Sequence, residues 1–150
     1  MEKWMHLALA EAKKAASLGE LPVGAVVVKE GKLIAAAGNA REALRDPSAH
    51  AEILALRAAG ALLGDWRLDG CELYATLEPC AMCAAAIQQA RLKRVVFGAF
   101  DGEKGACGSL YALPMDERLG RPVEITGGLL RDECEALLQA FFAKSRRKSE

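Results

Sequence analysis

The chain has 150 residues, which is the length of one ordinary domain. Hydrophobic residues make up 52% of it and charged residues 27%, so the disordered and fibrous classes of protein are excluded. Its 20 basic and 20 acidic side chains cancel, whereas a protein that coats duplex nucleic acid is usually strongly basic. We expect residues 1–150 to form a single domain that binds any nucleic-acid partner locally.

Membrane and secretion signals are missing from the sequence pattern. No apolar run approaches the eighteen or so residues that a membrane span requires, and residues 21–28 form one of the longest runs. The N-terminal segment carries charges at Glu2, Lys3 and Glu11 and does not resemble a signal peptide. We therefore expect a cytoplasmic protein whose five cysteines are reduced, because an odd number fits a disulfide framework poorly.

The first third of the chain predicts a helix followed by a β-hairpin. Apolar residues recur at helical spacing over residues 5–16, with charges on the other side, and Gly19 is a plausible helix end. Residues 22–29 and 32–37 are rich in β-forming side chains. The pair Glu30–Gly31 between them predicts a tight turn.

The middle of the chain predicts alternating helices and strands. Residues 39–47 form a polar loop that ends in helix-start signals, and a helix is expected over residues 50–63. A short strand at residues 72–76, a helix at residues 80–91 and a buried strand at residues 95–98 follow. This alternation is typical of an α/β protein with a mixed sheet covered on both faces.

The last third begins with a glycine-rich loop, which we define as residues 99–109. Residues 122–126 predict a final strand. The last helix has an apolar face between residues 130 and 141. It ends in the basic residues Lys144, Arg146, Arg147 and Lys148. These cations either complement the helix dipole or contact RNA, and the sequence favours neither reading.

Two short motifs carry the chemistry, and each opens a predicted helix. The first places His50 two residues before Glu52, and the second is Pro79-Cys80-Ala-Met-Cys83. Cys80 and Cys83 have i, i+3 spacing, so both sulfurs leave one face of the first helical turn. Pro79 suits a helix start, and the positive end of the helix dipole favours thiolates.

One imidazole and two thiolates are the donor set that zinc prefers. Three protein ligands leave a coordination position for water, which is the pattern of a catalytic site. Glu52 is then placed to take a proton from that water without binding the metal. The pattern H-x-E…P-C-x-x-C resembles the signature of the zinc-dependent nucleobase deaminases.

Other interpretations of these motifs are weaker. A lone C-x-x-C can be a redox pair, but Pro79 and the separate His50 motif argue against this. The glycine-rich loop fits neither phosphate-binding pattern. A structural zinc site would need a fourth ligand, and the candidates are Cys71, Cys107, Cys134 and His6. Cys71 and Cys134 are better explained as small buried hydrophobic residues.

The residues assembled so far resemble the bacterial tRNA-specific adenosine deaminases of the cytidine deaminase superfamily. The resemblance covers nearly the whole chain. It is carried by residues 20–25, Asn39, residues 46–53, residues 76–83, Asp101 and residues 105–109, 123–126 and 132–138. The metal motif identifies only the superfamily, and the glycine-rich loop and C-terminal segment point to the tRNA branch.

The resemblance implies a three-layer α/β/α fold with a five-stranded mixed sheet, and a homodimer. It implies one Zn²⁺ per subunit held by His50, Cys80 and Cys83, with Glu52 as the proton shuttle. The helix over residues 80–91 offers a second face for a dimer contact, or for a helix of the same chain. The residues on this face are Met82, Ala85, Ala86 and Ala90.

The resemblance also implies a substrate, the wobble adenosine at position 34 of a tRNA anticodon stem–loop, which is converted to inosine. Asn39 would bind the flipped base, and Asp101 would lie near the sugar of the nucleotide. Phe100 and Lys104 stand where stacking or phosphate contacts would be made. Two alternatives remain open, a deaminase of free guanine, cytosine or cytidine, and a zinc-stabilised RNA-binding module without turnover. The carboxylate of Glu52 argues against the second.

Overall fold

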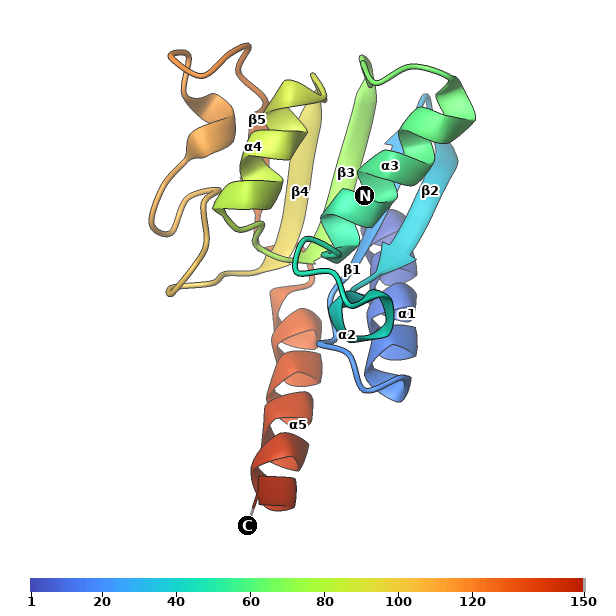
Figure 1. Ribbon diagram of the computed structural model, residues 1–150. Coiled ribbons are helices and arrows are strands. Elements are labelled where there is room, and N and C mark those ends of the chain that lie inside the picture. Colours follow the sequence, from blue (N-terminus) through green and yellow to red (C-terminus); the bar gives the residue numbers. More distant parts are fainter. Residues whose placement is uncertain (150) are drawn as a thin grey trace.

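The computed structural model describes residues 1–149, and side chains up to Arg147 (Figure 1). Its centre is a five-stranded sheet with the strand order β2-β1-β3-β4-β5. The strands are β1 (Gly24–Lys29), β2 (Lys32–Gly38), β3 (Cys71–Leu77), β4 (Arg94–Ala99) and β5 (Glu124–Gly127). The sequence predicts the final strand over residues 122–126, and the structure has it at Glu124–Gly127. Pro122 lies outside the strand, and it has no backbone N–H to donate to a neighbouring strand.

The sheet is mixed, as the alternation of elements predicted. β1 pairs antiparallel with β2 and with β3, whereas the pairs β3–β4 and β4–β5 are parallel. The expected hairpin turn is present, with φ of 51° at Glu30 and 73° at Gly31. Positive φ at both central residues is the geometry of a type I′ turn, whose twist matches that of the flanking strands.

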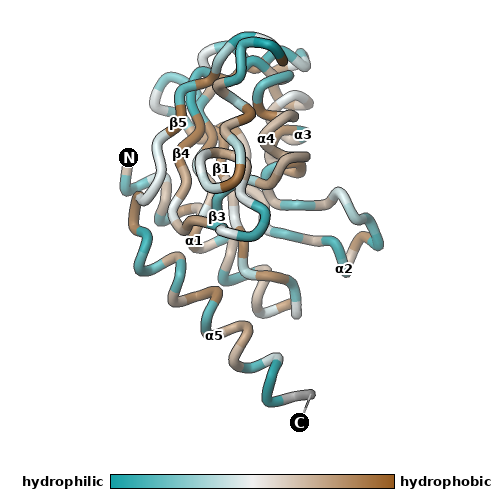
Figure 2. The backbone as a smooth tube through the Cα atoms, turned by 90° about the vertical axis from the view of Figure 1, so that its left-hand side faces the viewer, coloured by the Kyte–Doolittle hydropathy of each residue, from teal (hydrophilic) through white to brown (hydrophobic). Residues whose placement is uncertain are grey.

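Helices cover both faces of the sheet and complete the three-layer α/β/α architecture. Figure 2 shows α1 and α5 on one side of the strands and α3 and α4 on the other. The bounds are α1 (Glu2–Ser17), α3 (Ala51–Leu63), α4 (Ala81–Gln89) and α5 (Arg131–Ser149). Within residues 1–149, no helix is long and apolar enough to cross a membrane.

The central strand β1 divides its side chains between two cores. Val26 and Val28 pack with Met5 of α1, whereas Ala25 and Val27 belong to the core under α3 and α4. These five residues are at most 1% exposed. Successive side chains of a strand point to opposite faces, so a strand covered on both faces is apolar throughout.

A glycine lets α1 lie directly against this strand. A Cβ atom at Gly24 would lie 2.0 Å from the backbone oxygen of Ala8. The absence of a side chain at Gly24 therefore sets the close spacing between helix and sheet. Gly19 adopts φ of +81° just after α1 ends at Ser17, which confirms the predicted end of this helix.

The polar loop at residues 39–47 is more ordered than the sequence suggested, because it contains the short helix α2 (Arg41–Leu44). The carboxylate of Glu20 accepts hydrogen bonds from the backbone N–H groups of Glu42 and Ala43, at 3.0 and 2.8 Å. Glu20 lies more than twenty residues before Glu42 and Ala43, so the sequence around α2 gives no sign of this stabilising contact. A 3₁₀ turn, η1 (Leu113–Met115), was likewise not predicted.

Candidate active site

The two chemical motifs lie at the starts of α3 and α4. His50 is the N-cap residue of α3 and Cys80 is the N-cap residue of α4, so each helix begins one residue later than expected. Figure 1 places the two N-termini side by side at the end of β3. Both helices direct the positive ends of their dipoles toward the space between them.

The side chains of His50, Cys80 and Cys83 form a compact group, which we call the His–Cys–Cys cluster. His50 Nδ1 lies 3.7 Å from Cys80 Sγ and 3.5 Å from Cys83 Sγ. A tetrahedral zinc ion with ordinary Zn–N and Zn–S bonds has N–S edges of about 3.6 Å. The cluster therefore fits zinc in both donor type and spacing.

The two thiols share their protons unequally. A hydrogen bond from Cys83 lowers the pKa of Cys80 to about 3. The same hydrogen bond, together with burial, raises the pKa of Cys83. Cys80 is thus the more readily ionised of the two thiols, and Cys83 must give up its proton before both can serve as thiolate ligands. Binding of a metal ion is expected to release it.

No fourth ligand joins the cluster among the residues that the structure describes. Cys71 and Cys134 are at most 1% exposed and belong to the two cores, as predicted. Cys107 is buried as well, and burial raises its pKa to about 12. The fourth candidate, His6, is exposed on α1 near Glu133. The arrangement keeps one position of a tetrahedral metal open.

Glu52 is buried beside the cluster, on the first turn of α3. It is 4% exposed and is not a member of the cluster itself. Burial raises its pKa to about 6. A carboxyl group whose pKa lies near the working pH can both accept and return a proton.

A cavity of about 110 Å³ opens next to the cluster. This volume is below the usual range for drug-sized ligands and suits a single planar base. Its lining includes Asn39, Asp101 and Lys104, the polar residues that the sequence analysis placed near the target nucleotide. The lining residues are Leu21, Val23, Asn39, Arg41, His50, Glu52, Leu77, Glu78, Cys80, Asp101 and Lys104.

Asn39 is buried in one wall of this cavity, with 7% exposure. Its Nδ2 donates to Glu20 Oε1 at 3.4 Å. Because a carboxylate only accepts hydrogen bonds, Glu20 determines which end of the amide is the nitrogen. One N–H and the carbonyl oxygen of the amide remain for other partners.

Asp101 lies in another wall, within the glycine-rich loop. Its Oδ1 accepts hydrogen bonds from the backbone N–H groups of Glu103 and Lys104, at 3.0 and 3.1 Å. This turn orients the carboxylate, and Oδ2 takes no part in these two bonds. Asp101 thus has a local structural role besides any contact with substrate.

The neighbouring Phe100 is 42% exposed, and its ring meets Phe97 edge-on. The guanidinium of Arg131 lies 5.0 Å from the centroid of the same ring. Stacking of Phe100 on a base stays a prediction. Lys104 lines the cavity itself, which brings a positive charge to its edge.

Sequence reasoning missed two buried acids of the site, Glu20 and Glu78. Each is 2% exposed and accepts hydrogen bonds from backbone N–H groups of a loop that borders the cavity. A signal was available for Glu78, because it is a charged residue between a buried strand and Pro79. Glu20 follows a helix-ending glycine and gives no comparable signal.

The cluster generates a prediction about metal content. Cys83→Ala should lower zinc content well below one ion per chain and lower the melting temperature, because the free energy of metal binding contributes to folding. Cys71→Ala is the matched control, since it truncates a buried cysteine outside the cluster and should retain zinc. Elemental analysis of the two purified variants measures the difference. Full zinc occupancy in Cys83→Ala would contradict the assignment.

Comparison with known proteins places this site in a family. The model of the cytidine and deoxycytidylate deaminase zinc-binding region matches residues 1–99. The tRNA-specific adenosine deaminase of Bacillus subtilis is 48% identical over 147 residues, which are 98% of this chain and 91% of that protein. The enzyme of the same name from Haemophilus influenzae is 47% identical over 146 residues, covering 97% of this chain and 84% of that one.

Solved structures agree with the sequence relatives. A structure from a study of A-to-I editing by tRNA:A34 deaminases has a TM-score of 0.89 and 42% identity, and covers 92% of this chain and 100% of that chain. The guanine deaminase of Nitrosomonas europaea has a TM-score of 0.78 and 33% identity, covering 95% and 84%. This chain therefore belongs to the zinc-dependent cytidine and deoxycytidylate deaminase family and, within it, to the tRNA-specific adenosine deaminases.

Proposed function

We propose that this chain hydrolytically deaminates adenosine to inosine in RNA, and that its substrate is the wobble adenosine of a tRNA anticodon loop. One observation carries the proposal. A buried carboxylate, Glu52, lies beside a three-ligand zinc site in the wall of a cavity that suits one base. A structural zinc site has no use for such a group. The names of the relatives supply the class of substrate.

We assign His50, Cys80 and Cys83 as the ligands of one zinc ion. Zinc bound by three protein ligands lowers the pKa of a water molecule to about 7 and so provides a nucleophile at neutral pH. The protein residues fix the donor set and keep one position open. The helix N-termini at Cys80 and His50 favour the negative charge of the thiolates.

Glu52 moves the protons of the reaction. Its carboxylate takes a proton from the attacking water and passes it to N1 of the adenine as the C6–O bond forms. It then carries the second proton to the exocyclic amine as the C6–N bond breaks. Ammonia leaves and inosine remains, so one water molecule is consumed for each adenosine. A pKa of about 6, raised by burial, suits both directions of transfer.

Two residues are proposed to recognise the nucleotide. Asn39 offers both a donor and an acceptor, which the edge of a purine can use. The amide of Asn39 donates a hydrogen bond to Glu20, which fixes the directions in which its donor and its acceptor face the cavity. Asp101 can accept from the ribose 2′-OH, the group that distinguishes RNA from DNA. The base must leave its stack to enter the cavity, which favours a single-stranded loop.

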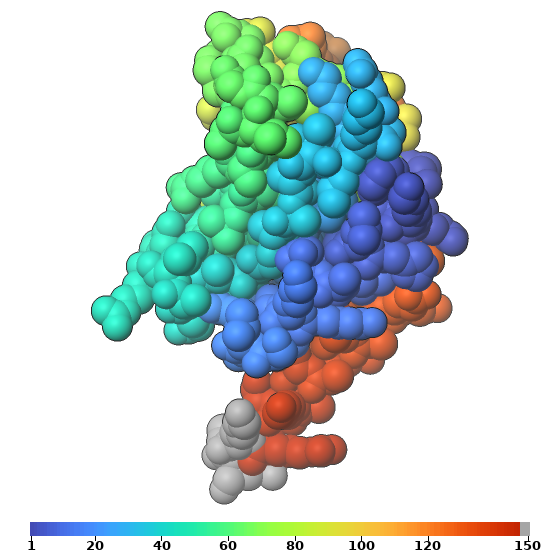
Figure 3. Space-filling model, turned by 90° about the vertical axis from the view of Figure 1, so that its right-hand side faces the viewer, coloured from blue at the N-terminus to red at the C-terminus, as the bar shows by residue number. Residues whose placement is uncertain are grey.

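The C-terminal helix adds local positive charge for the stem of the RNA. α5 extends beyond the body of the molecule (Figures 1 and 3), and Lys144, Arg146 and Arg147 are exposed near its end. The side chain of Lys148, the fourth basic residue expected there, lies outside the described residues. A short basic segment can contact phosphates although the net charge of the chain is zero.

A deaminase of free guanine is the second candidate. Guanine deaminases from Nitrosomonas europaea and Bacillus subtilis are among the similar structures, with TM-scores of 0.78 and 0.63. The Bacillus subtilis enzyme is 42% identical but covers only 66% of this chain. The metal motif does not separate a free base from RNA, because the shape of the pocket decides the substrate.

We also propose that residues 1–150 act as one catalytic domain in the cytoplasm. Both cores share a single sheet, which supports one domain. All five cysteines are free thiols, as expected in a reducing compartment.

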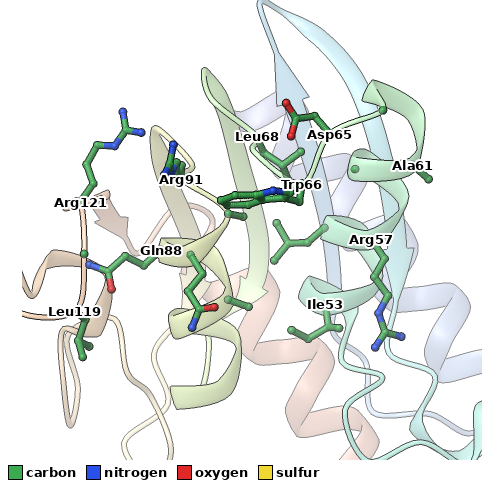
Figure 4. Close-up of a pocket in the computed structure, with 17 residues that line it drawn as sticks. Ile53, Arg57, Ala61, Asp65, Trp66, Leu68, Gln88, Arg91, Leu119 and Arg121 are labelled. Atoms are coloured by element: carbon green, nitrogen blue, oxygen red, sulfur yellow. The ribbon is translucent and has the colours of Figure 1, made fainter.

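The surface between α3 and α4 supports the proposal of a homodimer. A groove of about 1170 Å³ lies there, and Trp66, which is 57% exposed, lies across it (Figure 4). Ile53 and Ala86 line the groove from the two helices that also carry the cluster. Exposed apolar side chains in a groove can form an interface, and a second copy can cover Trp66 and its neighbours symmetrically. Met82, on the same face of α4, is 39% exposed.

The role of Glu52 can be separated from metal binding. Glu52→Ala should retain zinc and the fold but lose at least about 10²–10⁴-fold in kcat, since this is the usual contribution of general acid–base catalysis. Glu52→Gln is the matched variant, with the same shape and no basic oxygen pair. Zinc content and ammonia release are measured together. A variant that keeps the wild-type rate would exclude the proposed shuttle, and one that loses zinc would make Glu52 a ligand.

The substrate can be identified by nucleoside analysis. An anticodon stem–loop with adenosine at the wobble position should yield inosine, and the rate should fall as salt rises because phosphate contacts weaken. Free adenosine, cytidine and guanine should react poorly under the same conditions. Faster turnover of free guanine than of the stem–loop would establish the second candidate instead.

The dimer has its own test. Ala86→Arg places a long charged side chain in the groove and should convert a dimer into a monomer at micromolar concentration. Ala10→Arg introduces the same side chain at an exposed position of α1 and should leave the dimer intact. Sedimentation equilibrium distinguishes the species. A monomeric wild-type chain would show that the groove has another purpose.

A further inference from the structure

We propose that Glu78 is a positioning residue that holds Asp101 where the sugar of the target nucleotide binds. It does so by fixing the glycine-rich loop to the segment that carries Cys80. The proposal rests on the role given to Asp101 under the proposed function. It adds a residue that neither the zinc site nor the proton transfer requires.

Glu78 accepts four hydrogen bonds from the glycine-rich loop. The backbone N–H of Asp101 donates to Oε1 at 3.0 Å, and the hydroxyl of Ser109 donates to the same oxygen. The backbone N–H groups of Cys107 and Ser109 donate to Oε2 at 3.0 and 2.9 Å. The carboxylate thus spans the loop from its first turn to its end.

The two oxygens of Glu78 face donors only. Its side chain is 2% exposed, and the four groups that contact it are three backbone N–H groups and one hydroxyl of the loop. A carboxylate presents acceptors only, so both oxygens serve the loop without a competing donor. An amide at this position would turn one acceptor into a donor that faces N–H groups.

Close packing at Gly105 also ties the glycine-rich loop to Glu78. A Cβ atom at Gly105 would lie 2.4 Å from the carboxylate carbon of Glu78 and 2.5 Å from the backbone oxygen of Asp101. The loop backbone therefore passes directly over Glu78. The N–H of Ala106 also donates to the oxygen of Pro79 at 2.9 Å, and Gly105 forms a β-bridge with Cys80.

These contacts place Asp101 relative to the metal site. Its backbone N–H is tied to Glu78, and its carboxylate is oriented by the turn to Lys104. Glu78 lies two residues before Cys80, whose sulfur belongs to the cluster. The position of the sugar contact is thereby linked to the position of the open metal site. Glu78 lines the cavity but acts through Asp101 rather than on the reacting atoms.

The test compares Glu78→Gln with Asp101→Asn in a double-mutant cycle, using the full zinc-loaded chain. Two stem–loops serve as substrates, with ribose or 2′-deoxyribose at the target nucleotide. Asp101→Asn keeps an oxygen for the turn and removes the second acceptor. We expect Glu78→Gln to raise KM for the ribose substrate by about tenfold, equivalent to one lost charged hydrogen bond, with little change in kcat. The preference for ribose should fall in both variants.

The double variant decides whether the two residues act together. If Glu78 acts through Asp101, Asp101→Asn has little further effect in the Glu78→Gln background. Additive effects, or an unchanged preference for ribose in Glu78→Gln, would reduce Glu78 to a stabilising residue and overturn the proposal. If Asp101→Asn alone changes nothing, the role of Asp101 and this proposal are both wrong, whereas deamination by Glu52 is unaffected.

Zinc content and thermal unfolding are measured on every variant. Should Glu78→Gln lose zinc or fail to fold, Ser109→Ala replaces it in the cycle, because it removes one donor and leaves the charge of Glu78 in place. A smaller effect in the same direction is expected. Additivity of Ser109→Ala with Asp101→Asn would again overturn the proposal.

Discussion

The site depends on one geometric constraint, the meeting of two helix N-termini at the carboxyl end of β3. Cys80 and Cys83 are three residues apart and approach each other whenever α4 forms. His50 comes from α3 and reaches the same point only because α3 and α4 lie on the same face of the sheet. Side chains within 4.8 Å of one another tolerate little movement of either helix. The packing of two helices on one sheet therefore sets the donor spacing on which the chemistry depends.

Three buried acids surround this point, and their surroundings give them different roles. Glu52 has its pKa raised by burial, which suits a group that exchanges protons. Glu78 is buried to a similar degree but is ionised by its hydrogen bonds, which suits an anchor. Glu20 accepts from the backbone of α2 and from Asn39. The acid that we propose to exchange protons is thus distinguished from the two that hold loops by the number of hydrogen-bond donors around it.

Much of the architecture could be predicted from local patterns. The hairpin, the main helices and the mixed sheet follow from periodicity and from turn residues, and all are confirmed. Local sequence patterns predicted less about the segments that a distant side chain stabilises. α2 forms because Glu20 accepts its N-terminal N–H groups, and the glycine-rich loop is ordered because Glu78 accepts from both of its ends. Neither contact can be recognised from the residues of the segment that it stabilises, although the charge of Glu78 between a buried strand and Pro79 was itself a signal.

The sequence by itself determined the donor set, the i, i+3 thiolates at a helix start and the separate H-x-E motif, because these depend on residue type and short spacing. From them the class of chemistry follows without a structure. Only the tertiary structure decided that the histidine meets both sulfurs, that Asn39 and Asp101 border one cavity, and that Glu78 and Glu20 hold these walls. The physical reason is distance along the chain. These interactions join residues 19 or more positions apart and exist only once the sheet and its helices have packed.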